Sequence, residues 1–193
     1  MNDIVRLMIQ GGRGTDKRQV FVDESLQSGL TLVAVSIPSD QLVETRRCVR
    51  QLLLPQQTHL HFTRESDGRR RMIMKSLTEL SVAVVIYEFS GRSPMRVARA
   101  RCLRALLGDL AEGSCERLVI ENDESLRDSD IRVLYRAVRD VNLHESLTYA
   151  HVVKRAEPLL WVADAFAWCW THKLWREVLK PVDLEMRRVG DEA

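Results

Sequence analysis

The chain has 193 residues, 45% of them apolar and 29% charged, which is the composition of a globular protein rather than of a disordered or fibrous one. Its formal charge is only +2, so the molecule as a whole has no field that would hold a polyanion, and any contact with nucleic acid must come from a local patch. The four cysteines lie far apart without a C-x-x-C spacing, which argues against a zinc site or a disulfide framework and favours a reducing compartment.

The first ten residues, MNDIVRLMIQ, contain an early acid and too short an apolar run for a signal peptide, and the later apolar runs are strand-sized. We therefore expect a cytoplasmic protein without a membrane segment. The glycine and charge cluster GGRGTDKR, at 11–18, separates this beginning from the first strand. We expect residues 1–17 to form a loose N-terminal segment and residues 18–193 to form a single domain.

Strand and helix patterns alternate along the rest of the chain. Strands at 18–24 and 30–37, joined by a short Ser-Gly turn, predict an antiparallel hairpin. They are followed by a helix that Ser39 or Asp40 opens and Pro55 ends. The elements after it are a short HLHF strand at 59–62, a helix from about Ser66 and a strand at 81–89.

In the second half, Ser93 and Pro94 predict the N-cap and first turn of a helix that runs to Gly113. The remaining elements are a strand at 117–123, a helix at about 125–140, a last strand at 146–153 and a long closing helix at about 158–179. This alternation indicates an α/β sheet that is partly parallel. A hairpin followed by helix-linked strands is the order expected of a ribonuclease H-like mixed sheet flanked by helices, although other mixed folds also satisfy it.

Acidic residues stand at the ends of two predicted strands. Because alternate side chains of a strand point to opposite faces, Asp23 and Glu24 cannot both face one site from within the first strand. In the strand at 117–123, Glu121 and Asp123 share a face. If these strands are parallel neighbours, their acids lie at the carboxyl ends, where open α/β sheets bind ligands.

A third acid, Asp164, interrupts the apolar and aromatic stretch AEPLLWVADAFAWCW. Trp161 and Trp168, three and four residues away, mark its helix face as covered, where a lone carboxylate is costly without a partner. Carboxylates of this kind suit Mg²⁺ or Mn²⁺, and a pair of such ions about 4 Å apart makes phosphodiester cleavage feasible. The predicted ligands are Asp23, Glu121 and Asp164, with Glu24, Asp123 and Glu157 in reserve. Each acid taken singly is also consistent with a helix cap or a surface ion pair.

Other residues have weaker patterns. His61, which shares a face of HLHF with His59, could move a proton, although contact with backbone or solvent is its more ordinary role. Tryptophans recur every seven residues at 161, 168 and 175, which favours core packing or a dimer contact over base stacking. Arginines that could contact phosphate, or simply form exposed helix faces, are Arg69, Arg70, Arg71, Arg92, Arg96 and Arg99.

Four stretches of the chain carry a family resemblance: VFVDES, LHF at 60–62, LVIEND and EPLLWVADAFAW. Together, over about residues 20–175, they resemble the domain-of-unknown-function family numbered 3800. The resemblance implies a fold similar to ribonuclease H-like and integrase-like nucleases, with acids on the first strand, a middle strand and the last helix. It implies metal-binding roles for Asp23 and Asp164 and an auxiliary role for Glu24, and it leaves the middle acid open between Glu121 and Asp123.

The sequence and the resemblance together predict a divalent-metal-dependent nuclease that acts on DNA or RNA. Its catalytic acids would be Asp23, Glu24, Glu121 and Asp164, with His61 and Glu157 as auxiliary residues. Leu26 replaces the glycine that commonly follows the serine in that family, which changes the turn but not the acid. The alternative is a non-catalytic module on the same scaffold that binds nucleic acid or protein, and a homodimer is compatible with both.

Overall fold

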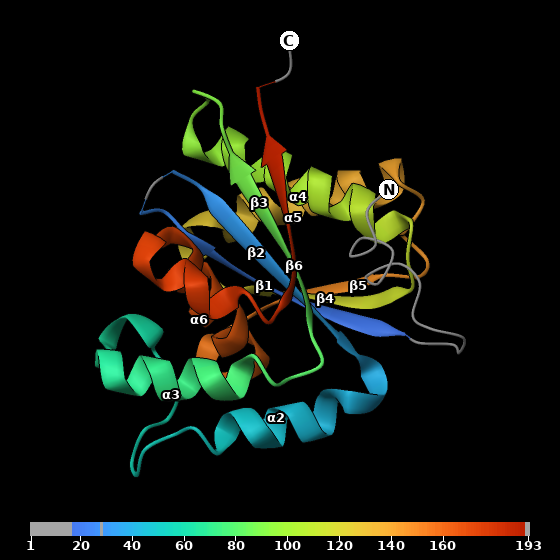
Figure 1. The fold of residues 1–193 in the computed structure, drawn as a ribbon. Coiled ribbons are helices and arrows are strands. Elements are labelled where there is room, and N and C mark those ends of the chain that lie inside the picture. Colours follow the sequence, from blue (N-terminus) through green and yellow to red (C-terminus); the bar gives the residue numbers. More distant parts are fainter. Residues whose placement is uncertain (1–16, 28, 192–193) are drawn as a thin grey trace.

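The structure, a computed structural model, describes residues 17–27 and 29–191. Of the loose segment expected at 1–17, residues 1–16 lie outside the described residues. A single mixed sheet has the strand order β5-β4-β1-β2-β3-β6 (Figure 1). Its strands are β1 (Arg18–Ser25), β2 (Thr31–Pro38), β3 (Ala83–Phe89), β4 (Cys115–Glu121), β5 (Thr148–Val152) and β6 (Asp183–Val189).

The centre of the sheet is the predicted hairpin, in which β1 pairs with β2 in antiparallel register. β2 also pairs antiparallel with β3, whereas β1 with β4, β4 with β5 and β3 with β6 are parallel pairs. The partly parallel α/β sheet expected from the sequence is therefore confirmed. Because β1 and β4 are parallel neighbours, their carboxyl ends lie at the same edge of the sheet, as the hypothesis for the acids requires.

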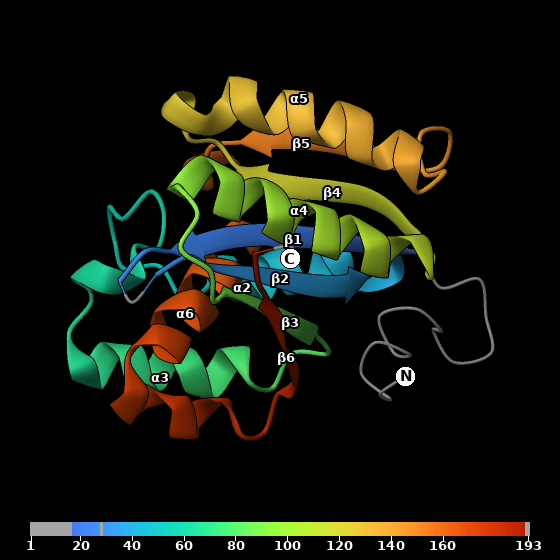
Figure 2. The same ribbon diagram turned by 90° about the horizontal axis from the view of Figure 1, so that it is seen from above.

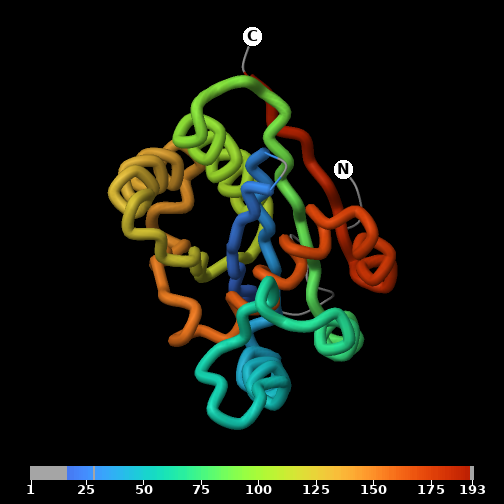
Figure 3. Tube along the Cα trace, turned by 90° about the vertical axis from the view of Figure 1, so that its left-hand side faces the viewer, coloured from blue at the N-terminus to red at the C-terminus, as the bar shows by residue number. Residues whose placement is uncertain are grey.

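Helices cover both faces of the sheet (Figure 2). One face carries α2 (Leu42–Arg50), α3 (Asp67–Leu77) and α6 (Leu159–Thr171), and the other carries α4 (Met95–Ala111) and α5 (Glu124–Asp140). Figure 3 shows the same layers along the chain trace. The short 3-10 turns are η1 (Ser39–Gln41), η2 (Phe62–Arg64), η3 (Lys154–Ala156) and η4 (Lys173–Leu179). No helix of the described residues is long and apolar enough to span a membrane.

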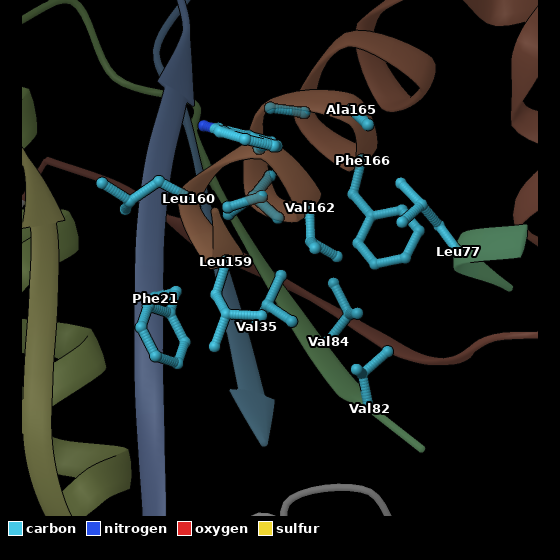
Figure 4. Packing of buried hydrophobic residues seen from close by; sticks show 14 of the residues in the cluster. Phe21, Val35, Leu77, Val82, Val84, Leu159, Leu160, Val162, Ala165 and Phe166 are labelled. Carbon is cyan, nitrogen blue, oxygen red and sulfur yellow. The ribbon is translucent and has the colours of Figure 1, made fainter. Parts of the chain in front are cut away.

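Helix α6 is apolar on almost every side, and such a helix needs cover all round. The sheet provides one side of this cover, with Phe21 of β1 and Val84 of β3 in one buried cluster with Leu159, Val162 and Phe166 (Figure 4). The other sides contact α2, η2 and η4. This burial fixes α6 firmly against β1, so a polar side chain on α6 that faces β1 has a well-defined position.

The alternation of β1 divides the core into two clusters. Phe21 packs in the α6 layer, whereas Val20 and Val22 pack with Leu103 of α4 and Leu134 of α5. Neighbouring residues near the end of β1 consequently face different helix layers.

The predicted strand at 59–62 is wrong. These residues lie in the connection between α2 and α3, and the turn η2 begins at Phe62. The alternation in HLHF does report burial, because Leu60 and Phe62 are 1% and 0% exposed. Within residues 17–27 and 29–191 the segment has no strand partner, however, and the Phe62 N–H donates instead to a carboxylate oxygen of Asp164, at 3.2 Å.

The end of the chain also differs from the prediction. The closing helix stops at Thr171, because His172 is extended (φ −95°, ψ 93°), and residues 173–179 form the turn η4. The strand at 146–153 is not the last one, since β6 follows as an edge strand beside β3. Its charged residues hide the strand pattern, and charges of this kind commonly protect sheet edges from aggregation.

The start of α4 is shifted slightly from the prediction. Pro94, rather than Ser93, is the N-cap, and the Ser93 hydroxyl donates to Asp191 beyond β6.

Candidate functional site

Two acids project from the carboxyl ends of the parallel neighbours β1 and β4. Asp23 is 3% exposed and lies on the same face of β1 as Phe21, the α6 face. Glu121 ends β4, and 31% of its side chain is exposed. The Asp23 carboxylate is oriented locally, because its Oδ1 accepts a hydrogen bond of 2.7 Å from the backbone N–H of Glu24.

Asp164 comes to the same place from α6. The helix buries this residue to 9% exposure, and its Oδ2 accepts the Phe62 N–H. The buried carboxylate therefore has one fixed donor, as buried polar groups require. Because α6 lies directly against β1, the other carboxylate oxygen faces the strand ends. We call Asp23, Glu121 and Asp164 the carboxylate triad.

One ammonium lies at the centre of the carboxylate triad. Lys154 Nζ is 2.9 Å from Asp23 Oδ2, 3.0 Å from Glu121 Oε2 and 3.2 Å from Asp164 Oδ1. Lys154 comes from η3, directly after β5, and 17% of its side chain is exposed. The sequence reasoning missed this residue. The available signal was a lysine just after a strand, close to strands that end in acids.

The electrostatics of the carboxylate triad follow from its burial. Burial raises the pKa of Asp23 well above its usual range, and its hydrogen bond with Glu121 raises it further against the opposing effect of Lys154. Burial also raises the pKa of Asp164. Burial alone would lower the pKa of Lys154, but the three carboxylates outweigh it and raise that pKa. The ammonium is therefore the stable form of Lys154, and it compensates three acids incompletely.

Glu24 belongs to a second ionic network, on the α4 and α5 side of the sheet. It forms an ion pair with Arg99 of α4. Arg99 also donates hydrogen bonds of 2.8–3.1 Å to both carboxylate oxygens of Asp130 of α5, and His151 lies 3.4 Å from the same carboxylate. Burial would raise the pKa of Asp130, but hydrogen bonds from His151 and Arg99 outweigh it and lower the pKa. The two adjacent acids of β1 thus serve two separate networks.

A pocket of about 340 Å³ opens at the ends of β1 and β4 and the start of α5. Carboxylates dominate its polar lining, and Arg99 is its basic residue. The acids that line it are Asp23, Glu24, Glu121, Asp123 and Glu124. Asp23 and Glu121 therefore border an acidic opening, in which Glu121 is the member of the carboxylate triad that reaches solvent. Such an opening attracts cations and repels phosphate.

Neither a known family model nor any curated protein matches the chain significantly. Among solved structures, the chain is similar to ribonuclease HII in the complex of PCNA with RNase HII from Archaeoglobus fulgidus. The likeness has a TM-score of 0.55 at 10% sequence identity, and it covers 84% of this chain and 77% of that chain. The chain has a ribonuclease H-like fold. At this identity the likeness shows the fold alone, so the site has to be judged on its own chemistry.

On this ribonuclease H-like scaffold, the reserve acids have other partners. Asp123 caps α5, where its carboxylate accepts from the Ser125 N–H at 2.8 Å. The middle acid that joins the other two is therefore Glu121. Glu157 forms a two-point ion pair with Arg46 of α2, at 2.9 Å. Asp123 and Glu157 thus have the two roles, helix cap and ion pair, that the sequence left open for each acid taken singly.

His61 is half-buried, and its Nδ1 makes no hydrogen bond within the described residues. Burial lowers the pKa of this histidine, and the nearby Asp164 opposes the effect. His61 therefore lies close enough to the carboxylate triad to experience its charge.

The arginines do not form one exposed strip. Arg99 is 3% exposed, so the expectation that it contacts phosphate or forms part of an exposed helix face is wrong. Arg69 and Arg70 turn back onto the protein, where they donate to the backbone of Leu52, Phe62 and Thr63.

Arg71, Arg92 and Arg96 remain exposed. Among the tryptophans, Trp161 is buried, as the core interpretation expects. Trp168 packs edge-on against Phe62, at 5.3 Å between ring centroids.

The donors of the carboxylate triad fit Mg²⁺ or Mn²⁺ in kind, because these ions prefer carboxylate oxygens. In residues 17–27 and 29–191, no three His, Cys, Asp or Glu side chains are arranged as a ready metal site. The three carboxylates instead surround the ammonium of Lys154 at ion-pair distances. A positive charge at this point is thus a property of the fold.

Proposed function

We propose that the protein is a divalent-metal-dependent nuclease that hydrolyses phosphodiester bonds of nucleic acid. The observation that carries the proposal is the convergence of Asp23, Glu121 and Asp164, from β1, β4 and α6, on a single cation. The resemblance to the family numbered 3800 also implies metal-binding roles for Asp23 and Asp164. We therefore propose further that the protein is a member of that family.

In this proposal the carboxylate triad would hold Mg²⁺ or Mn²⁺, which supplies activation of water and neutralisation of phosphate charge when bound. The chain orients the ligands: the Glu24 N–H fixes Asp23, and the Phe62 N–H fixes Asp164. Arg99 and its partner Asp130 hold Glu24 at the wall of the acidic pocket. An acidic pocket repels a phosphodiester backbone, so the substrate requires cations at the site. The exposed Arg71, Arg92 and Arg96 are candidates for contacts with more distant phosphates.

A non-catalytic binding module is the second candidate. The observation that favours it is the ammonium of Lys154, which already forms ion pairs with all three acids. A protein of this kind would use the acids for structure and would bind its nucleic-acid or protein partner elsewhere on the surface. The two candidates differ in whether the carboxylate triad is needed for chemistry.

The test is hydrolysis of end-labelled DNA, RNA and RNA–DNA hybrid oligonucleotides, single- and double-stranded, with Mg²⁺, Mn²⁺ or EDTA. We expect metal-dependent cleavage by the wild type that Asp23→Asn and Asp164→Asn abolish. Glu124→Gln is the matched control, because it removes a carboxylate from the same pocket without touching the carboxylate triad. Cleavage that survives Asp23→Asn, or the absence of cleavage of every substrate, would overturn the nuclease proposal.

A further inference from the structure

Lys154 lies among the three acids that are the proposed metal ligands. Its ammonium lies within 3.2 Å of all three acids, and its side chain is 17% exposed. The positive charge of Lys154 balances part of the negative charge that the proposed metal ion would balance. The two cations therefore compete for the same oxygens.

Distances show why both cations cannot share the centre of the carboxylate triad. The ammonium holds its three oxygens at 2.9 to 3.2 Å. Mg²⁺ takes its oxygen ligands at about 2.0–2.1 Å, so it needs the carboxylates drawn inward into the volume that the ammonium fills. Like charges at such a separation also repel strongly in a site this buried.

The anchoring of Lys154 allows its side chain to leave without a change of fold. Its carbonyl oxygen accepts a hydrogen bond of 2.7 Å from the indole N–H of Trp161, which is 2% exposed. The backbone is thereby fixed to α6, whereas the four-carbon side chain is flexible. Glu121, whose side chain is 31% exposed, lines the acidic pocket and offers an approach for a hydrated cation.

We propose that the Lys154 ammonium and the divalent metal ion are alternative occupants of the carboxylate triad, so that the metal binds only when the Lys154 side chain leaves. The inference rests on the proposed function. It assigns to Lys154 the part of a resident counter-ion, which keeps the buried acids compensated in the metal-free protein and lowers the apparent affinity for the metal. The carboxylate triad would then need a higher free metal concentration for half occupancy than it would need without the Lys154 side chain.

The test is calorimetric titration of Mn²⁺ into the full chain as wild type, Lys154→Met, Lys154→Arg and Arg155→Met. If Lys154 occupies the centre in nine of ten molecules or more, Lys154→Met lowers the apparent Kd about tenfold or more. Lys154→Arg keeps a cation and should bind as weakly as the wild type. Arg155→Met is the matched control, because it removes the same charge from an exposed position of the same turn, and its Kd should stay near the wild-type value.

If Lys154→Met does not fold without metal, because it leaves three acids uncompensated, its melting temperature at increasing Mn²⁺ reports the same affinity by linkage. An affinity of Lys154→Met equal to or weaker than that of the wild type, no binding by either, or an equal gain in Arg155→Met would each overturn the inference. If the affinities shift as expected but no substrate is cleaved, the nuclease proposal alone fails. If metal-dependent cleavage occurs with unchanged affinities, only the inference about Lys154 fails.

Discussion

Replacement of Arg99 by methionine tests whether the network behind Glu24 supports the fold. The Arg99 and Asp130 side chains are 4% and 3% exposed, and hydrogen bonds of 2.8–3.1 Å join them. Removal of one partner of such a buried pair costs about 3–5 kcal/mol, because the other charge stays buried without compensation. Glu24 adds less to the loss, since 19% of its side chain already reaches solvent.

For a chain of this length each kcal/mol corresponds to about 2–4 °C, so Arg99→Met should lower the melting temperature by about 6–20 °C. The free energy of unfolding is measured by urea titration, with thermal melting as a second probe. Arg96→Met on the exposed side of the same helix is the control and should change stability by less than about 0.5 kcal/mol.

The double variant Arg99→Met with Asp130→Leu distinguishes a charge effect from a packing effect. An apolar replacement of both partners is often neutral or stabilising, so the second change should restore much of the lost stability. A cost below about 1 kcal/mol for Arg99→Met, or a further loss in the double variant, would show that the buried Arg99–Asp130 pair does not support the fold.

The remaining predictions concern Asp164 and the cysteines. Asp164→Asn keeps an acceptor for the Phe62 N–H and removes a carboxylate whose pKa burial raises, so the metal-free variant should equal or exceed the wild type in stability at neutral pH. A carboxyl whose folded-state pKa is raised lowers the stability of the protein as the pH rises through that pKa. The stability advantage of the variant, measured by urea titration, should therefore shrink as the pH falls. A large loss of stability in the variant would instead mark Asp164 as structural. Burial raises the pKa of Cys102 to about 11 and those of Cys115 and Cys169 to about 12, so a thiol reagent should label half-buried Cys48 alone in the native protein and four thiols after unfolding. Rapid native labelling of a second thiol would contradict the buried placement of the other three.

Sequence alone was enough for the parts of the site that depend on periodicity. The period of two in β1 correctly separates Asp23 from Glu24, and the position of Asp164 in an apolar helix correctly indicates a buried carboxylate. The parallel pairing of β1 with β4 then brings Glu121 to Asp23. The choice of Glu121 over Asp123 needed the structure, because it depends on where the strand ends and α5 begins.

Long-range pairing of charges could not be predicted from the pattern. Lys154 reaches the carboxylate triad from a three-residue turn, and Arg99 meets Asp130 across two helices. Spacing within one helix says nothing about a partner on another, so Arg99 resembled a surface arginine. The strand β6 was missed for a related reason, since only its parallel pairing with β3 makes a charged sequence a strand.

We propose above that Asp23 and Asp164, 141 residues apart in the sequence, form one divalent-metal site together with Glu121. The measurement that tests it most directly is calorimetric titration of Mn²⁺ into the wild type, Asp23→Asn, Asp164→Asn and the control Glu124→Gln. The wild type should bind Mn²⁺ saturably, each of the two Asn variants should abolish this binding, and Glu124→Gln should retain it. Binding indifferent to both Asn variants, or no binding by the wild type and by Lys154→Met, would contradict the proposal.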